Sequence, residues 1–365
     1  MSTKPAEKIN WVNTLFLTIC PLAALVGTVL LCILGALTWK TWVLFGVFTY
    51  LTGLSITAGY HRLFSHKTYQ APAPIRLIYL LLAAATFEGS VLEWSSDHRV
   101  HHRHSDTEKD PYNIKRGFWY AHIGWLIRLD TSKRDFSNVA DLQADPLCRL
   151  QHRFYIPLAI LVGFILPMGI AWSWGAPLAG LIIGGALRIS VNHHFTFFIN
   201  SLCHTIGKRP YSEEESARDH WVAAIFTYGE GYHNYHHKFP IDYRNGVRLF
   251  HYDPAKWLIW ALSKVGLATN LKRISSQRIA HYILQTQKLE EKTERVDARE
   301  IILQTKERIL LVIQRLEAIE KEYIESLKAA SCKVTIKNCR YQLRQARRDL
   351  SRGLSSWSKL VKQYA

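Results

Sequence analysis

Long apolar runs alternate with polar segments through the first two thirds of the chain. Residues 15–37 form 23 consecutive positions without a charge, and a second apolar run at 41–59 follows closely. Two more runs, at 154–174 and 176–199, are separated by almost no loop. A helix of about 20 apolar residues is long enough to cross the roughly 30 Å hydrocarbon core of a bilayer. The pattern therefore predicts an all-α integral membrane protein with four transmembrane helices, arranged as two hairpins.

A fifth apolar stretch, residues 75–93, is interrupted by Glu88 and Glu93 and is compatible with a span, a re-entrant segment or a helix in the membrane interface. We expect an interfacial helix, because a span would place the histidines at 61 and 66 on the opposite side of the membrane from those at 98–102. Positive charge is distributed unevenly around the spans. The hairpin tips carry only Lys40, whereas residues 60–153 carry 13 lysines and arginines. Because cationic loops stay on the cytosolic side, we expect both termini and the long polar segments there, forming a helical cap over the spans.

The formal net charge is +17, and residues 271–365 contribute ten of these charges, with 21 basic and 11 acidic side chains. In a protein with membrane spans, this excess favours membrane lipids or an acidic partner over nucleic acid. The six cysteines include no C-x-x-C pair, which is typical of a reducing compartment.

The C-terminal third has the composition of long helices. The last 95 residues contain no proline and a single glycine, Gly353. Apolar positions recur there at coiled-coil spacing, namely Ile302, Ile309, Val312, Leu316, Ile319 and Tyr323. We therefore divide the chain into a membrane domain, 1–273, and a basic helical extension, 274–365. The extension is either a hairpin that folds on itself or an arm for self-association or partner docking.

Histidines are grouped along the chain in a way that indicates metal binding. Two segments share the spacing H-x-x-H-H, and a pair occurs in HRLFSH. Positions i, i+3 and i+4 lie on one face of a helix. Eight imidazoles exceed the four ligands of a structural zinc, so two ions of higher coordination number use them better. The chain has no H-E-x-x-H motif of a zinc protease. The eight candidates are His61, His66, His98, His101, His102, His233, His236 and His237.

The phrases SITAGYHRLFSH, DPYNIKRGFWYAHIGW, GEGYHNYHHKFP and YDPAKWLIWALSKVGLA resemble those of membrane-bound fatty acyl desaturases, in particular the delta-9 group that includes stearoyl-CoA desaturases. The resemblance covers residues 10–273. It implies a cytosolic centre with two Fe²⁺ ions above four membrane helices. Such a centre uses O₂ and two electrons to insert a cis double bond into a saturated acyl chain, here acyl-CoA or acyl-lipid.

Carried over to this chain, the resemblance implies a ninth metal ligand, His204, and a water-mediated one, Asn200. It implies no ligand at His193 or His194. Asp97 and Glu230 stand beside two of the histidine motifs. Each is either a group that orients a ligand or a solvated charge.

The resemblance also assigns substrate contacts. The residues that shape the bend of an acyl tunnel are Trp94, Thr196 and Phe197, and Lys115 and Arg116 meet the phosphates of coenzyme A. Ser96 replaces an arginine of animal members, which leaves an acyl-lipid or an acyl-carrier protein as an alternative substrate. Gly53, two helical turns before His61, either leaves room for the methyl end of the chain or serves helix packing.

The chain contains neither a dinucleotide-binding glycine motif nor the HPGG phrase of a fused haem domain. We therefore expect a separate electron donor of the cytochrome b5 or ferredoxin type. An alkyl or lipid hydroxylase with the same histidine motifs is the alternative function. A divalent-metal transporter is a further alternative, but it needs ligands at the bilayer midplane. The chain resembles compact bacterial members, so we expect the bacterial inner membrane rather than the endoplasmic reticulum.

Overall fold

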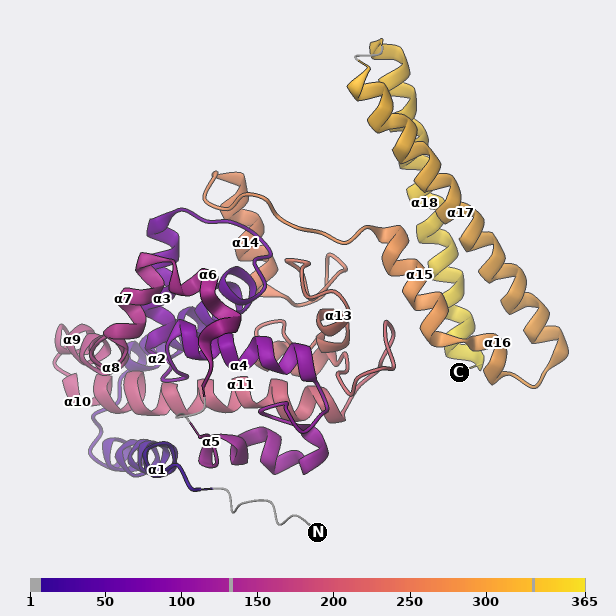
Figure 1. Ribbon diagram of the computed structural model, residues 1–365. Helices are drawn as coiled ribbons and strands as arrows, with labels where there is room; N and C mark the ends of the chain where they lie inside the picture. The colour runs from indigo at the N-terminus through magenta and orange to yellow at the C-terminus, as the bar shows by residue number, and fades with distance from the viewer. Residues whose placement is uncertain (1–7, 131–133, 330–331, 365) are drawn as a thin grey trace. The chain divides into compact units, whose positions relative to one another are not determined.

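The computed structural model describes residues 8–130, 134–329 and 332–364. Over these ranges the chain is helical, and isolated bridges are its only β-type pairing. It divides into two compact units (Figure 1). Unit 1 comprises Met1–Arg209 and Glu214–Arg273, and unit 2 comprises Pro210–Glu213 and Ile274–Ala365. The expected all-α class is confirmed for the described residues.

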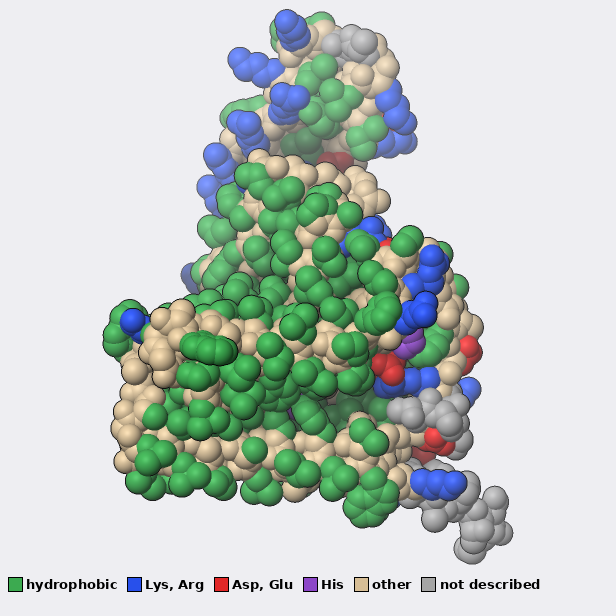
Figure 2. Space-filling model, turned by 90° about the vertical axis from the view of Figure 1, so that its left-hand side faces the viewer, with side chains coloured by type: hydrophobic (Ala, Val, Ile, Leu, Met, Phe, Trp, Pro, Cys, Tyr) green, Lys and Arg blue, Asp and Glu red, His purple; other side chains and the backbone are tan. Residues whose placement is uncertain are grey.

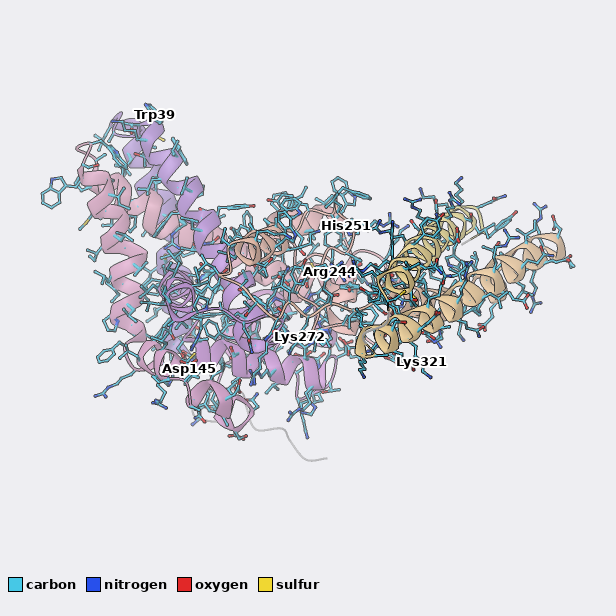
Figure 3. All side chains as sticks on the ribbon, turned by 90° about the horizontal axis from the view of Figure 1, so that it is seen from above. Trp39, Asp145, Arg244, His251, Lys272 and Lys321 are labelled. Carbon is cyan, nitrogen blue, oxygen red and sulfur yellow. The ribbon has the colours of Figure 1, made fainter. Side chains whose placement is uncertain are left out.

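Within the described part of unit 1, three helices are long and apolar enough to cross a membrane. They are α1 (Trp11–Ile33), α2 (Trp39–Leu54) continued by the π-helix η1 (Ser55–Ser65), and the run of α8 (Tyr155–Ile160), η6 (Leu161–Ile165) and α9 (Leu166–Trp172). Much of their apolar surface faces outward, and Figure 2 shows a broad hydrophobic face on this unit. Trp39 and Asp145 lie at opposite ends of these helices (Figure 3). Unit 1 is therefore built as an integral membrane protein.

The fourth expected span, 176–199, lies on a continuous helical run made of α10 (Pro177–Ala179), η7 (Gly180–Leu187) and α11 (Arg188–Thr205). This run is not among the three apolar helices. It packs against α1 and α2, and Arg188 is fully buried within it. The guanidinium donates to the carbonyls of Gly184, Ala85 and Gly163 at 2.9 to 3.1 Å. These bonds offset the cost of holding a charge inside the helix bundle.

The stretch 75–93 is divided between two helices, α3 (Ala73–Ala84) and α4 (Val91–His104), so the expectation of a single helix is wrong. The chain turns between them through Phe87 at φ 60° and Gly89 at φ 102°. Ser90 then starts α4 with a capping box, in which its side chain accepts from the Glu93 amide and the Glu93 carboxylate accepts from the Ser90 amide. This reciprocal pairing satisfies two free amides and starts a new helix where apolar content alone suggested continuation.

Short helices form the rest of unit 1, and four of them contribute Val139, Leu142, Cys148 and Ile259 to a core centred on η1, α3 and α4. The short helices are η2 (Ile114–Arg116), η3 (Tyr120–Gly124), α5 (Trp125–Ile127), η5 (Phe136–Val139), α6 (Ala140–Gln143), α7 (Pro146–Arg153), α12 (Trp221–Phe226), α13 (His233–Lys238) and α14 (Pro254–Lys264).

Unit 2 contains α15 (Ser276–Gln287), α16 (Leu289–Lys292) and a long hairpin of α17 (Val296–Lys328) and α18 (Lys333–Tyr364), which pack along their length (Figure 1). The heptad positions Ile302, Ile309 and Leu316 are at most 1% exposed and belong to the same core cluster as Trp357 of α18. A Cβ at Gly353 would lie 2.8 Å from Ile309, so the missing side chain permits the close approach. The heptad seam is therefore filled within one chain, as the hairpin interpretation requires.

Candidate metal centre and substrate cavity

Nine histidines of unit 1 converge in two groups. Within each group, one ring nitrogen from every member lies within 4.8 Å of all the others. All nine are the histidines singled out as ligands from the sequence. The first group is His61, His66, His98, His102 and His236, and the second is His101, His204, His233 and His237.

Each H-x-x-H-H triple contributes to both groups, because its three positions do not point in quite the same direction. On α4, His98 and His102 belong to the first group, whereas His101 belongs to the second. On α13 the assignment is reversed: the pair at i and i+4 joins the second group, and His236 joins the first. Two short helices therefore hold both groups together and set the distance between them.

His61 and His66 reach one group because of the π-helix η1. Residues five apart are separated by about 140° around an α-helix, so they would point apart. In a π-helix, each amide bonds to the carbonyl five residues earlier, and the amide of His66 bonds to the carbonyl of His61 at 3.1 Å. The wider turn brings both imidazoles to the same side.

The spacing of the ring nitrogens fits shared metal ions. The Nε2 atoms of His66 and His98 are 2.8 Å apart, and those of His101 and His237 are 3.2 Å apart. Two ligand nitrogens about 2.1 Å from one ion, at right angles to each other, lie roughly 3.0 Å apart. Burial and the neighbouring histidines lower the pKa of His98 and His102 well below the ordinary value. These rings are neutral and present lone pairs, which suits a transition metal.

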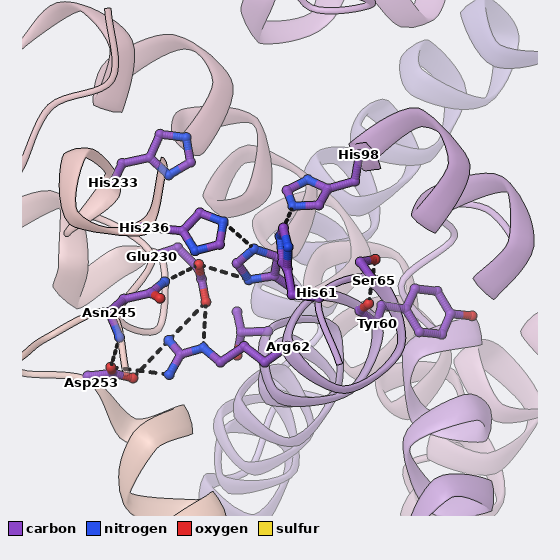
Figure 4. A network of polar contacts seen from close by, with 12 residues as sticks. Tyr60, His61, Arg62, Ser65, His98, Glu230, His233, His236, Asn245 and Asp253 are labelled. Atoms are coloured by element: carbon purple, nitrogen blue, oxygen red, sulfur yellow. Dashed lines mark hydrogen bonds and ion pairs between the residues drawn. The ribbon is translucent and has the colours of Figure 1, made fainter. Parts of the chain in front are cut away.

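Glu230 stands directly behind one of the candidate ligands, His61, as one of its two interpretations predicted. Its carboxylate lies 3.0 Å from Nδ1 of His61 and pairs with Arg62 at 3.0 Å (Figure 4). Arg62 in turn pairs with Asp253, and Asn245 donates to Oε2 of Glu230, the same oxygen that faces His61. An acceptor on Nδ1 fixes the tautomer that leaves Nε2 free for a metal. The network therefore locks His61 in the orientation of a ligand.

Two further carboxylates behind ligands were missed in the sequence. Asp110 lies 2.8 Å from Nδ1 of His101, and Glu215 bonds to Nδ1 of His237. Asp110 begins the phrase DPYN and Glu215 ends a run of three glutamates, so each was adjacent to a recognisable pattern. Asp110 lies nine residues from His101 in the sequence and Glu215 lies 22 residues from His237, so only the fold shows these pairings.

Asp97 has a different environment from the one suggested by its place beside His98. Its carboxylate accepts from Arg134 at 2.7 Å, and the same arginine pairs with Glu93. Burial raises the pKa of the Asp97 carboxyl, and Arg134 opposes this shift. The structure places Asp97 in a cavity wall, where it is held by an arginine and not by a ligand histidine.

A largely apolar cavity of about 560 Å³ adjoins both histidine groups. This volume is typical of small-molecule sites. The cavity wall includes ligand histidines of both groups together with Asn200, and it includes all three residues assigned to the tunnel bend. Those three are Trp94, Thr196 and Phe197.

Glu88 connects two of these wall residues and was not recognised as part of the site. Its carboxyl accepts from the Thr196 hydroxyl at 2.9 Å and from the Trp94 indole at 3.3 Å. The Trp94 ring stacks on His98 with centroids 4.8 Å apart. Burial in this apolar wall raises the pKa of Glu88 to about 7.

The remaining sequence candidates lie outside the cavity wall. A Cβ on Gly53 would come within 2.2 Å of the Tyr228 ring, so the glycine allows this aromatic side chain to pack against α2. Lys115 and Arg116 are exposed on η2, where Arg116 donates to the Tyr120 hydroxyl at 2.6 Å.

His193 and His194, which were excluded as ligands, lie outside both histidine groups. Nε2 of His193 lies 2.7 Å from the carbonyl oxygen of Thr86, and Nδ1 of His194 lies 3.0 Å from Nε2 of His122. The structure therefore gives both rings partners other than a metal.

Comparison with known proteins places this site in a family. Residues 36–270 match the family model described as fatty acid desaturase. The chain is 43% identical over 279 residues to a probable acyl-CoA desaturase of Schizosaccharomyces pombe, and 45% identical over 245 residues to acyl-CoA desaturase 1 of Saccharomyces cerevisiae. It is 37% identical over 280 residues to stearoyl-CoA desaturase 5 of Bos taurus.

These matches cover 76%, 66% and 75% of the chain, respectively. They span 57% and 48% of the two yeast proteins but 82% of the bovine one. Because these relatives are fungal and mammalian, they give no support to the expected bacterial type or to a bacterial inner membrane. The extent of the match, with the histidine groups that it contains, shows that the chain belongs to the fatty acid desaturase family.

Proposed function

We propose that this protein is an O₂-dependent acyl-CoA desaturase that introduces a cis double bond, at the delta-9 position, into a saturated acyl chain. The observation that carries the proposal is the shared wall between the apolar cavity and the two histidine groups: His61, His98, His101 and His233 belong to both. The family match supports the reaction class, and the names of the yeast and bovine relatives support acyl-CoA as the substrate.

We assign two Fe²⁺ ions to the histidine groups, five ligands to one and four to the other, with Asn200 reaching the second through water. An all-imidazole ligand set with open positions suits iron that activates dioxygen. When bound, this pair would supply the oxidant that removes hydrogen from an unactivated methylene. Glu230, Asp110 and Glu215 keep the histidine rings in their ligand orientation, so the site is organised before substrate enters.

The cavity residues would position the acyl chain. Apolar walls exclude water from the reacting carbons, and the distance between the head-group anchor and the metals selects the carbon that is oxidised. Trp94, Thr196 and Phe197 line the part of the wall beside the histidines and would bend the chain there. Lys115 and Arg116 are exposed, which suits a contact with the phosphates of coenzyme A outside the cavity.

We further propose a fourth membrane span along α10, η7 and α11, with the histidine cap on the cytosolic side. Bonds from Arg188 to backbone carbonyls make this helix compatible with a membrane bundle despite its charge. The cationic excess of residues 60–153 over the hairpin tips supports the orientation. A separate carrier of the cytochrome b5 or ferredoxin type would supply electrons, and its acidic surface would be attracted by the basic cytosolic face.

The fatty-acid profile of a desaturase-deficient host tests the proposal. The intact chain is expected to produce cis-9 monoenes, and a variant with His101→Ala and His102→Ala is expected to produce none, at equal expression. The purified intact protein is expected to hold about two irons per chain. Hydroxylated acyl chains would instead identify a hydroxylase. Exchangeable zinc without any acyl product would contradict an oxidase and support metal transport.

A further inference from the structure

The outward face of α18 carries an unusual concentration of positive charge. This helix contains nine basic residues and one acidic residue, Asp349, whereas α17 contains six basic and seven acidic residues. All nine cations are exposed. They are Lys333, Lys337, Arg340, Arg344, Arg347, Arg348, Arg352, Lys359 and Lys362.

Helical geometry places these cations on one side. The buried positions of α18, among them Leu343, Ala346 and Leu350, define the side that packs on α17. At about 100° per residue, the nine basic positions fall within roughly 140° of one another, on the opposite side. Over 32 residues such a face extends roughly 48 Å. The result is a continuous cationic stripe, and lysines and arginines are prominent on the hairpin in Figure 2.

One edge of the stripe forms a groove that can accept an anion. It has a volume of about 360 Å³ and lies between α17 and α18. Arg340, Arg344 and Arg347 line it together with Glu320 and Tyr323. Arg340 donates to the Tyr323 hydroxyl at 2.9 Å and Arg347 pairs with Glu320 at 3.1 Å, so two guanidinium groups are held in place. Fixed guanidinium forks are well suited to phosphate oxygens.

We propose that this stripe, defined as the exposed basic residues of α18, docks on the anionic phospholipid head groups of the membrane that holds unit 1. The chain supplies the reason for choosing a lipid surface. Unit 1 carries the membrane spans, α14 ends at Lys264, and α15 begins at Ser276. A short connection keeps the hairpin at high effective concentration next to the bilayer surface. Basic segments near a membrane are attracted by anionic lipids, and salt screens the attraction.

Energy transfer from the hairpin to the lipid surface tests the proposal in the full-length protein. Cys332 is exposed and takes the donor dye, and Cys32, the other exposed cysteine, is changed to serine. The protein is placed in nanodiscs that contain a trace of lipid with an acceptor dye on its head group. Transfer is expected to be at least twofold more efficient in discs with 30% phosphatidylserine than in pure phosphatidylcholine, and to fall to the phosphatidylcholine level in 0.5 M NaCl.

Two variants that each lose three positive charges distinguish the effect of the stripe from the effect of total net charge. Neutralising Arg344, Arg348 and Arg352 to glutamine is expected to abolish the dependence on phosphatidylserine. The matched control neutralises the exposed Arg299, Arg308 and Arg315 of α17 and is expected to retain it. Both variants should keep the helicity and elution profile of the parent protein.

Equal transfer in both disc types, or an equal loss in both variants, would overturn the proposal. An acidic carrier is the competing partner. Transfer efficiency that is independent of lipid charge, together with slower turnover of the α18 variant with an acidic electron donor, would show that the stripe binds that protein. The lipid assignment would then be wrong. The inference depends on the membrane spans and not on desaturase chemistry, so acyl product measured in the same discs separates failure of one proposal from failure of the other.

Discussion

Replacement of Glu88 by glutamine tests the electrostatics of the cavity wall. The side chain is half-buried, its carboxyl accepts hydrogen bonds from Thr196 and Trp94, and desolvation raises its pKa from 4.5 to about 7. Glutamine has nearly the same shape and keeps one acceptor and one donor group, as a protonated carboxylic acid does. The Glu88→Gln variant therefore mimics the protonated Glu88 carboxyl at every pH.

The sign of the effect follows from proton linkage. Between pH 4.5 and 7 the folded state binds more protons at Glu88 than the unfolded state, so stability falls as pH rises through this window. The full shift of 2.5 pH units, from 4.5 to about 7, corresponds to about 3 kcal/mol, reached above pH 7. About 2 kcal/mol of this loss of folding stability occurs between pH 5.5 and 8.5. The stabilising effect of glutamine should grow by the same amount.

Thermal unfolding in detergent measures this difference. We expect the Tm of the Glu88→Gln variant to exceed that of the parent protein by a margin that widens by roughly 3 °C from pH 5.5 to 8.5. Other titrating groups are common to both proteins and cancel. Glu322→Gln, at an exposed position of α17, controls for the loss of a carboxylate. A Tm difference that is independent of pH would refute the desolvated, protonated state inferred for Glu88.

Three further substitutions test other parts of the structure. Glu230→Gln weakens the acceptor behind His61 and is expected to reduce iron affinity by 10-fold to 100-fold, measured by competition with a chelator; unchanged affinity would contradict its role in orienting the ligand. Gly53→Ala is expected to lower Tm because its Cβ collides with Tyr228, while the chain length of the products stays the same; a shift to shorter products at normal Tm would restore the tunnel-end interpretation. Trp357→Ala removes a core residue of the hairpin that is 1% exposed, and it is expected to destabilise unit 2 by about 3–5 kcal/mol. Hydrogen exchange of α17 and α18 measures that loss, and unaltered exchange would show that the hairpin core lies elsewhere.

Much of the site could be predicted from the sequence because its chemistry is local along the chain. Apolar runs of sufficient length indicate membrane helices, and the six histidines of the two H-x-x-H-H motifs have the spacing of one helix face. Glu230 was also found, since it lies beside the motif that contains His233. The expectation of one helix at 75–93 was wrong because it relied on hydropathy alone. The capping box of Ser90 and Glu93 is the local signal that a new helix begins there.

Other features depended on contacts between distant segments. Sequence spacing placed three histidines on a helix face but did not divide each triple between two groups, because the division depends on how α4 and α13 face each other. Asp97 and Asp110 are equally acidic neighbours of the same motif. Only packing decides that the first meets Arg134 and the second meets His101.

The sequence by itself thus determined the helical class, the apolar helices and the histidine-rich character of the site, because these depend on composition and on spacing within one turn or one span. The tertiary structure decided which histidines converge in each group, which carboxylate lies in the cavity wall, and which helix the heptad positions of α17 pack against. Ile309 could pack against a second chain or against α18, and the heptad pattern is the same in both cases. The fold resolves this because a short connection brings α18 back onto α17, and Gly353 allows the two helices to approach closely.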